Sequence, residues 1–118
     1  MKKILYVEDN KDTANAVKTV LANAGFNVEI APNGNQCLRK SKNPFDLYIL
    51  DIMLPDMSGW DLFEKLKENN TKSKFVFLSV IPMSTERIKE LRRAGVSDCI
   101  TKPFGKSDLI SRIKKILR

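Results

Sequence analysis

Three carboxylates in this chain directly follow runs of apolar residues, where a charge is rare unless another group neutralises or uses it. Asp51 follows the run at 47–50, and Glu8 and Asp9 follow the run at 4–7. A Pro and a Gly soon after Asp51 indicate that the chain leaves its strand for a loop. We therefore expect Asp51 to stand at the carboxyl end of a buried strand.

Two further polar residues, Ser79 and Lys102, also end predicted strands. Parallel strands present their carboxyl ends at one edge of the sheet, which is where ligands bind in open α/β folds. Three carboxylates gathered at that edge repel one another, so each resists ionising unless a cation lies among them. The sequence therefore predicts a cation site.

Oxygen ligands suit a small hard dication, and Mg²⁺ needs only one or two carboxylates beside its waters and a phosphoryl oxygen. We expect Asp9 and Asp51 to bind Mg²⁺ directly, with a loop carbonyl near Met53 contributing and Glu8 holding a coordinated water. Lys102 and the Ser79 hydroxyl suit the oxygens of a phosphoryl group on Asp51. The reaction that this set predicts is in-line phosphoryl transfer to the Asp51 carboxylate.

Five apolar strands alternate with five helical segments around these residues. We predict strands at 3–8, 27–31, 46–50, 74–78 and 96–101. We predict helices at 34–41, from a cap at Asn10 or Asp12 to about 24, from Ser58 to about 68, from Ser84 or Thr85 to about 93, and from Ser107 onward. The last helix should turn Leu109, Ile110, Ile113, Ile116 and Leu117 inward.

This alternation predicts a parallel sheet covered by helices on both faces. The first, third and fourth strands are continuous apolar runs and should lie centrally, whereas the second and fifth are more polar and should lie at the edges. We therefore predict one α/β domain over residues 1–118, a doubly wound (βα)₅ three-layer sandwich of the flavodoxin-like kind with strand order 2-1-3-4-5.

Composition narrows the range of functions. The chain has no His, which excludes Ser-His-Asp catalysis, His-ligated zinc and a phosphohistidine donor of its own. Cys37 and Cys99 form no metal-binding pair and are expected to be ordinary thiols in a cytoplasmic protein. The net charge of +7 is spread over every predicted helix and mixed with acids, so we expect solvated helix faces rather than direct nucleic-acid binding. No membrane span is predicted.

Three motifs resemble the receiver domain of two-component response regulators, chemotaxis regulators among them. They are Val7-Glu8-Asp9-Asn10, the segment from Leu50 to Gly59, and Thr101-Lys102-Pro103-Phe104, and the resemblance covers the whole chain. It implies that Asp51 accepts a phosphoryl group from a histidine kinase or a phosphotransfer protein. It also implies Mg²⁺ bound by Asp9, Asp51 and the Met53 carbonyl, and a cis peptide before Pro103. Asp56 lies beyond this set and is expected to be an exposed loop residue.

Several positions depart from or refine the family pattern. Cys99 stands where receivers commonly carry Tyr or Phe, so we expect a reduced rearrangement of the surface formed by the fourth helix, fifth strand and fifth helix. In receivers the positions of Met53 and Ile81 flank the path of the hydrolytic water, and two apolar side chains there predict slow self-dephosphorylation. We expect no other enzymatic activity. A similarity to receivers that precede DNA-binding domains implies a phosphorylation-dependent homodimer through Asp98 and Arg112.

Four alternatives to a phosphoacceptor remain open at this point. They are a degenerate receiver that acts only as a protein-interaction module, a flavodoxin-like cofactor binder, an aspartyl-phosphate hydrolase, and a nucleic-acid binder, for which a steep salt dependence of DNA retention would be the signature. The second needs a phosphate loop after the first strand, where the chain instead has Glu8-Asp9-Asn10, which would repel phosphate. The third normally needs a general acid and a cap domain, for which the chain is short.

Overall fold

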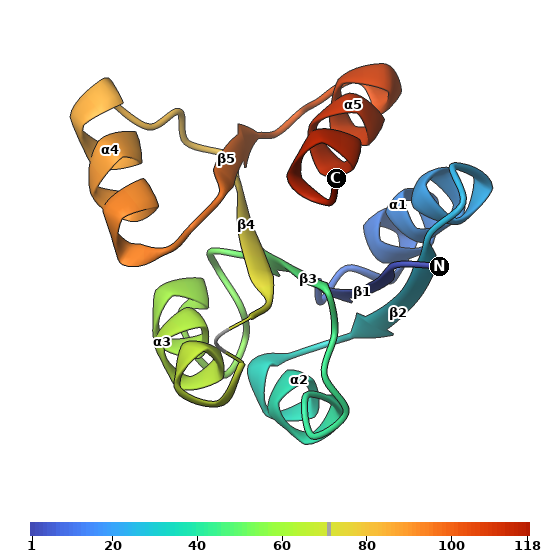
Figure 1. The fold of residues 1–118 in the computed structure, drawn as a ribbon, viewed down its shortest axis with the longest axis horizontal. Helices are drawn as coiled ribbons and strands as arrows, with labels where there is room; N and C mark the ends of the chain where they lie inside the picture. The colour runs from blue at the N-terminus through green and yellow to red at the C-terminus, as the bar shows by residue number, and fades with distance from the viewer. Residues whose placement is uncertain (71) are drawn as a thin grey trace.

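The computed structural model describes residues 1–70 and 72–118, and in them five strands alternate with five helices (Figure 1). The elements in chain order are β1 Lys3–Val7, α1 Lys11–Asn23, β2 Asn27–Ala31, α2 Gly34–Lys40, β3 Leu47–Asp51, α3 Gly59–Asn69, β4 Lys74–Ser79, α4 Thr85–Ala94, β5 Asp98–Thr101 and α5 Lys106–Ile116.

All the strands pair in parallel in the order β2-β1-β3-β4-β5, which confirms the predicted doubly wound topology. Helices α1 and α5 cover one face of the sheet and α2, α3 and α4 the other (Figure 1). None of the helices in the described residues is long and apolar enough to cross a membrane.

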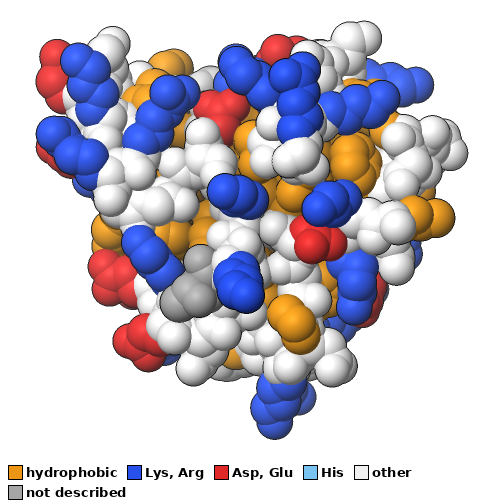
Figure 2. Space-filling view, viewed as in Figure 1, with side chains coloured by type: hydrophobic (Ala, Val, Ile, Leu, Met, Phe, Trp, Pro, Cys, Tyr) orange, Lys and Arg blue, Asp and Glu red, His pale blue; other side chains and the backbone are white. Residues whose placement is uncertain are grey.

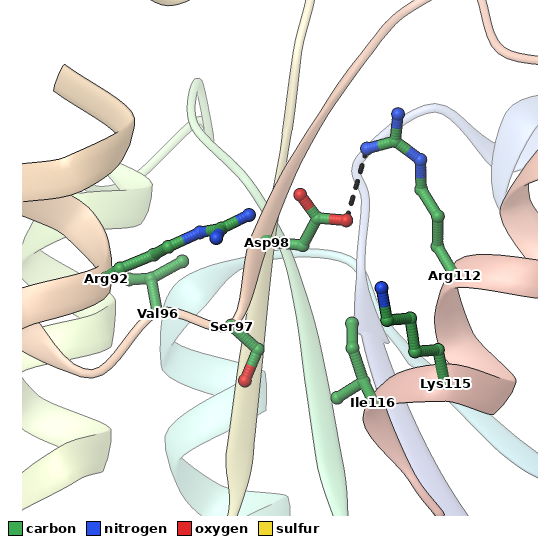
Figure 3. Close-up of a pocket in the computed structure, with 7 residues that line it drawn as sticks. All are labelled: Arg92, Val96, Ser97, Asp98, Arg112, Lys115 and Ile116. Carbon is green, nitrogen blue, oxygen red and sulfur yellow. Dashed lines mark hydrogen bonds and ion pairs between the residues drawn. The ribbon is translucent and has the colours of Figure 1, made fainter. Parts of the chain in front are cut away.

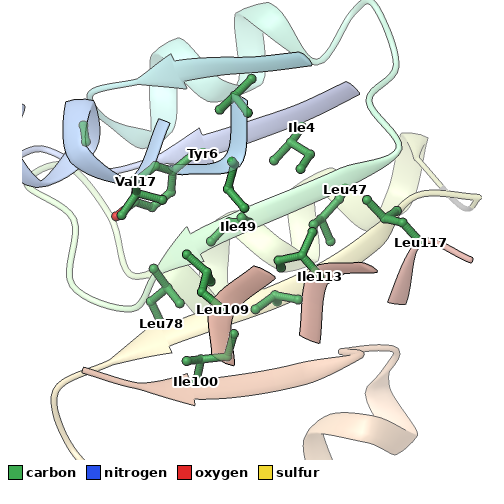
Figure 4. Packing of buried hydrophobic residues seen from close by; sticks show 14 residues of the cluster. Ile4, Tyr6, Val17, Leu47, Ile49, Leu78, Ile100, Leu109, Ile113 and Leu117 are labelled. Atoms are coloured by element: carbon green, nitrogen blue, oxygen red, sulfur yellow. The ribbon is translucent and has the colours of Figure 1, made fainter. Parts of the chain in front are cut away.

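Alternate residues of each strand enter two separate hydrophobic cores. Ile4 and Ile49 belong to the core under α1 and α5, with Leu109, Ile113 and Leu117 packed against them from α5 (Figure 4). Leu5 and Leu50 belong to the core on the opposite face of the sheet, which is rich in aromatic rings. Both faces of β1 and β3 are buried, so the sheet sets where the backbone of the acidic residues at the ends of these strands lies.

Most predicted helix ends are confirmed. The side chains of Asn10, Ser58 and Ser84 each accept a hydrogen bond from the backbone N–H three residues later. Gly25 and Gly95 follow α1 and α4 with φ of +100° and +111°, a conformation that favours glycine.

The start of α5 was predicted wrongly. Its N-cap is Gly105, no side chain caps it, and Ser107 lies inside the helix. Ser107 is the usual type of capping residue, but the chain already turns at Gly105 after Pro103. Ile110 is also only partly buried and does not belong to either core, since it lies at the side of α5 rather than on its inner face.

Candidate functional site

The sheet register brings the predicted site residues to one edge. Val7 pairs with Leu50, Asp51 with Leu78, and Ser79 with Thr101, so the residues that end β1, β3, β4 and β5 lie in one row. Glu8, Asp9, Asp51, Ser79 and Lys102 are therefore neighbours in space, as predicted, although as many as 94 residues separate them in the chain.

Lys102 bridges two of the carboxylates. Its Nζ lies 2.9 Å from Glu8 Oε1 and 2.9 Å from Asp51 Oδ2. The peptide bond between Lys102 and Pro103 is cis, as the family resemblance implied. Burial by itself lowers the pKa of Lys102, but the hydrogen bonds to both carboxylates outweigh it and raise that pKa, so the ammonium stays charged.

Glu8 is buried, and both of its carboxylate oxygens accept hydrogen bonds. Oε1 also accepts a bond from the Tyr6 hydroxyl at 3.0 Å, and Oε2 accepts one from the Asn10 N–H at 3.3 Å. Burial raises the pKa of Glu8, but the bond from Lys102 and the other donors outweigh burial, and the net shift is downward. Glu8 is therefore a fixed negative charge inside the protein.

The Tyr6 hydroxyl was not foreseen as part of this site. The Tyr6 ring lies in the core under α1 and α5 (Figure 4). Its hydroxyl donates a hydrogen bond to Glu8. Burial, together with the charge of Glu8, raises the pKa of Tyr6 far above its ordinary value. The hydroxyl therefore keeps its proton and donates a hydrogen bond to Glu8. The sequence does hold the signal, because residues i and i+2 of a strand share a face and a buried Tyr hydroxyl needs a partner.

Asp51 is also held by its surroundings. Its Oδ1 accepts the Met53 N–H at 3.2 Å while Oδ2 faces Lys102. Burial raises the pKa of Asp51 above its ordinary value, and the negative charge of Glu8 adds to this, although Lys102 acts in the opposite direction. The start of α3 packs directly against the Asp51 backbone. Only glycine fits at position 59, because a Cβ there would collide with the Asp51 carbonyl oxygen.

The three carboxylates form a candidate cation site. One oxygen each from Glu8, Asp9 and Asp51 can be chosen so that all lie within 4.8 Å of one another. Glu8 is buried, Asp51 is half-buried and Asp9 is exposed, so the cluster has one side open to water. This all-oxygen donor set with a solvent-exposed side fits a hydrated Mg²⁺ ion. The expected ligation by the Met53 carbonyl stays a prediction.

Ser79 lies beside Asp51 but its hydroxyl is engaged elsewhere. Ser79 Oγ donates to the Ile81 carbonyl at 2.9 Å and accepts the Ile81 N–H at 3.1 Å. A hollow of about 170 Å³ lies between Asp51 and Ser79. It is lined by these two residues together with Ile52, Met53, Val80, Ile81 and Lys102. The apolar side chains of Met53 and Ile81 are 73% and 68% exposed, so they give the hollow an apolar rim.

Asp56 is exposed, as expected, yet it does more than occupy a loop. Its two oxygens accept the N–H groups of Gly34 and Asn35, each at 2.9 Å, at the start of α2. These bonds hold the pKa of the Asp56 carboxyl below its ordinary value, although its slight burial acts the other way. Asp56 thus ties the loop after Asp51 to α2, a role that needs tertiary contact and has no local sequence signal.

The surface formed by α4, β5 and α5 holds the other singled-out residues. Cys99 is half-buried, with its Sγ 3.5 Å from the Met83 sulfur, and both cysteines are free thiols. Asp98 and Arg112 are paired within the chain, with Arg112 Nη1 at 3.1 Å from Asp98 Oδ2.

Comparison with known proteins agrees with this geometry. Residues 4–114 match the family model described as the response regulator receiver domain. The transcriptional regulatory protein CusR of Escherichia coli K12 is 38% identical over 117 residues, which cover 98% of this chain and 51% of that protein. TrcR of Mycobacterium tuberculosis is 32% identical, with 98% and 45% covered.

A CheY-like response regulator receiver domain protein from Methanospirillum hungatei has a similar structure. Its TM-score is 0.89 at 34% identity, covering 99% of this chain and 94% of that one. This likeness extends over nearly the whole of both chains. By contrast, the chain spans about half the length of the curated relatives it matches.

Proposed function

Because the chain belongs to the receiver-domain family of response regulators, we propose that Asp51 accepts a phosphoryl group from the phosphohistidine of a sensor kinase or a phosphotransfer protein. The observation that carries this proposal is the sharing of Lys102 Nζ between Asp51 and Glu8 at the strand ends. A cation fixed beside the acceptor carboxylate is what an incoming phosphoryl group requires.

In this reaction an Asp51 oxygen attacks phosphorus as the bond from phosphorus to the donor imidazole breaks. The imidazole leaves with the electron pair of that bond, and an acyl phosphate forms on Asp51. Lys102 can keep its position, exchanging a carboxylate oxygen for a phosphoryl oxygen. Glu8 holds the other side of the ammonium, which aims Lys102 at the acceptor.

Asp9, Asp51 and the Met53 carbonyl are proposed to hold Mg²⁺, with Glu8 binding one of its waters. The ion, when bound, supplies charge that draws the phosphoryl oxygens in and offsets the repulsion from the carboxylates. Lys102 opposes the effect of burial on the pKa of Asp51 and so favours the ionised carboxylate that attacks.

Ser79 is proposed to report the phosphorylated state. Its hydroxyl must leave Ile81 to reach a phosphoryl oxygen across the small hollow, and this would reshape the turn that leads into α4. Cys99 and Met83 lie beyond that turn in place of an aromatic ring, so we expect a smaller rearrangement of α4, β5 and α5.

Beyond this acceptance step we propose no enzymatic activity other than slow self-dephosphorylation. Met53 and Ile81 line the hollow beside Asp51 and offer no polar group to orient a water. A Met53→Asn, Ile81→Glu double variant should therefore lose its phosphoryl group about tenfold faster. Equal decay rates of the two proteins would show that the apolar rim does not protect the acyl phosphate.

The proposal puts the protein in the cytoplasm, where its two free thiols stay reduced. The expected homodimer stays a prediction. A dimer that used Asp98 and Arg112 across its interface would first have to open the pair they form within one chain.

Incubation with acetyl phosphate, with and without Mg²⁺, tests the proposal by intact mass. The wild type should gain one phosphoryl group only when Mg²⁺ is present, and Asp51→Asn should gain none. Asp56→Asn is the matched control, since it alters a carboxylate at the same edge that lies outside the cluster, and it should still be labelled. A wild type that stays unlabelled would favour the degenerate receiver instead.

A further inference from the structure

The two oxygens of the Glu8 carboxylate are not equally free to face a cation. A carboxylate offers about four acceptor positions, two on each oxygen. Oε1 accepts bonds from both the Tyr6 hydroxyl at 3.0 Å and Lys102 Nζ at 2.9 Å. Oε2 accepts the Asn10 N–H at 3.3 Å, and these three bonds are the ones that Glu8 accepts among the described residues. Oε1 is therefore filled, and the free position of Glu8 lies on Oε2.

The Tyr6 hydroxyl fills its place on Oε1 from inside the protein. Tyr6 is 0% exposed, with its ring in the core under α1 and α5 (Figure 4), and the Glu8 side chain is 3% exposed. Because water does not reach this bond, neither partner can exchange it for a bond to solvent. A Phe ring would fill the same space in the core, so packing alone does not require the hydroxyl.

We propose that Tyr6 is a positioning residue that sets the ion preference of the cation site by acting through Glu8. With Oε1 occupied, Glu8 can offer a single oxygen and cannot chelate an ion with both. Ca²⁺ often takes both oxygens of a carboxylate, whereas Mg²⁺ keeps several of its waters. The Tyr6 hydroxyl therefore favours a hydrated Mg²⁺ ion over Ca²⁺. This inference rests on the Mg²⁺ binding proposed above and adds how the site distinguishes that ion.

The overall charge of the protein would not produce such a preference. The chain has a net charge of +7, and Lys and Arg side chains are spread widely over the face shown in Figure 2. The positive field of these side chains acts equally on Mg²⁺ and Ca²⁺, because the two ions carry the same charge. The ratio of the two affinities therefore isolates how the carboxylate oxygens are presented to the ion.

Calorimetric titration with MgCl₂ and with CaCl₂, at constant ionic strength, measures this ratio. Tyr6→Phe frees a position on Glu8 Oε1, so the ratio of the Ca²⁺ to the Mg²⁺ association constant should rise at least about fivefold. Tyr48→Phe is the matched control, because it also removes a buried hydroxyl, one that bonds Asn70 rather than a carboxylate of the site. It should change the ratio by less than about twofold.

Glu8→Gln shows whether Tyr6 acts through Glu8. An amide has a single oxygen and cannot chelate an ion, so adding Tyr6→Phe to Glu8→Gln should leave the ratio unchanged. An equal rise in the ratio in this background would overturn the proposal, because Tyr6 would then act through the core. Circular dichroism confirms that each variant is folded.

Two further outcomes separate this inference from the proposed function. A Tyr6→Phe protein that binds both ions with the wild-type ratio would overturn the inference alone, since the hydroxyl would then have only a structural role. A wild type that does not bind Mg²⁺ would overturn the proposed Mg²⁺ site, and the inference with it.

Discussion

Lys102 and Arg112 each bridge two carboxylates, Lys102 in the acidic pocket formed with Glu8, Asp9 and Asp51, and Arg112 on the surface formed by α4, β5 and α5 (Figure 3). The distances are alike, 2.9 Å to both partners of Lys102 and 3.1 Å to both partners of Arg112. The surroundings differ. The Lys102 side chain is 19% exposed and that of its partner Glu8 only 3%, whereas Arg112 is 40% exposed.

This difference separates a bridge that is held inside the protein from one that is held only at its surface. Water screens the Arg112 bridge, which can open at little cost. The Lys102 bridge lies where water is largely excluded, so each charge there depends on its neighbours. Partners 51 and 94 residues away fix Lys102 through the sheet, while those of Arg112 are 4 and 14 residues away.

The largest effect should follow from Lys102→Met. At pH 7 we expect roughly 2 kcal/mol less stability, between the values for exposed and for fully buried pairs, because Glu8 and Asp51 lose their shared cation. The folded-state pKa of both carboxylates then rises, so the loss shrinks as the pH falls and they protonate. Urea unfolding at pH 7 and pH 4 measures both quantities.

Lys106→Met is the control for this prediction, since Lys106 is an exposed lysine near the start of α5. It should change stability little at either pH. A Lys102→Met protein as stable as the wild type at pH 7 would remove the distinction drawn between the two bridges.

Mg²⁺ should act on the acidic pocket alone. At tenfold excess over its dissociation constant it should stabilise the protein by about 1.4 kcal/mol, because it binds the folded cluster and not the dispersed carboxylates. Asp9→Asn should abolish this gain and Asp98→Asn should preserve it. Thermal unfolding with and without the ion measures the effect, and an equal gain in all three proteins would mean that Mg²⁺ binds elsewhere.

The acidic pocket could be predicted from the sequence, but the pairing of Arg112 with Asp98 within the chain could not. Asp51 ends β3, whereas Glu8 and Lys102 directly follow β1 and β5, and parallel strands bring these ends to one edge of the sheet. The pair of Arg112 and Asp98 depends on how α5 is placed beside β5, which no local sequence pattern gives. The same reason explains the two errors on α5, where Gly105 took the place of Ser107 as the cap and Ile110 turned away from the core.

Two sets of hydrogen bonds, one tertiary and one local, were also not predicted from the sequence. The Asp56 bonds to α2 join residues more than 20 positions apart. Ser79 was correctly placed at the site, but its hydrogen bonds to Ile81 were not predicted. A hydroxyl can be satisfied equally by the Ile81 backbone or by an oxygen at the site, and the sequence does not distinguish the two.

Tyr6→Phe tests how much the hydrogen bond from the Tyr6 hydroxyl stabilises the charge of Glu8 in the acidic pocket. Losing one hydrogen bond to the Glu8 carboxylate should cost about 1 kcal/mol at pH 7. The Tyr6 hydroxyl helps to lower the folded-state pKa of Glu8, so its contribution is present above the ordinary pKa of about 4.3 and is lost as the pH falls through the lowered value.

Tyr48→Phe is the matched control, because the Tyr48 hydroxyl is buried and donates to the neutral Asn70 side chain at 3.1 Å. At pH 7 Tyr48→Phe should lower the free energy of unfolding by about as much as Tyr6→Phe does. At pH 4 the loss caused by Tyr48→Phe should be the same as at pH 7. Urea titrations of both proteins measure this, and equal pH dependence in the two would contradict a charge-specific role for Tyr6.

Arg112→Gln should have the smallest effect, about 0.5 kcal/mol or less, even though it removes as many ion pairs as Lys102→Met does. Asp98 stays solvated and keeps its hydrogen bond from the Cys99 N–H at 2.8 Å, so no buried charge is left alone. The remaining difference should vanish in high salt, because exposed charges are screened over about 3 Å at 1 M. A double-mutant cycle with Asp98→Asn in urea measures the coupling directly. A coupling near 2 kcal/mol would mean that the Arg112 bridge is as strongly held as the Lys102 bridge, and the exposure of a pair would then not predict its strength in this protein.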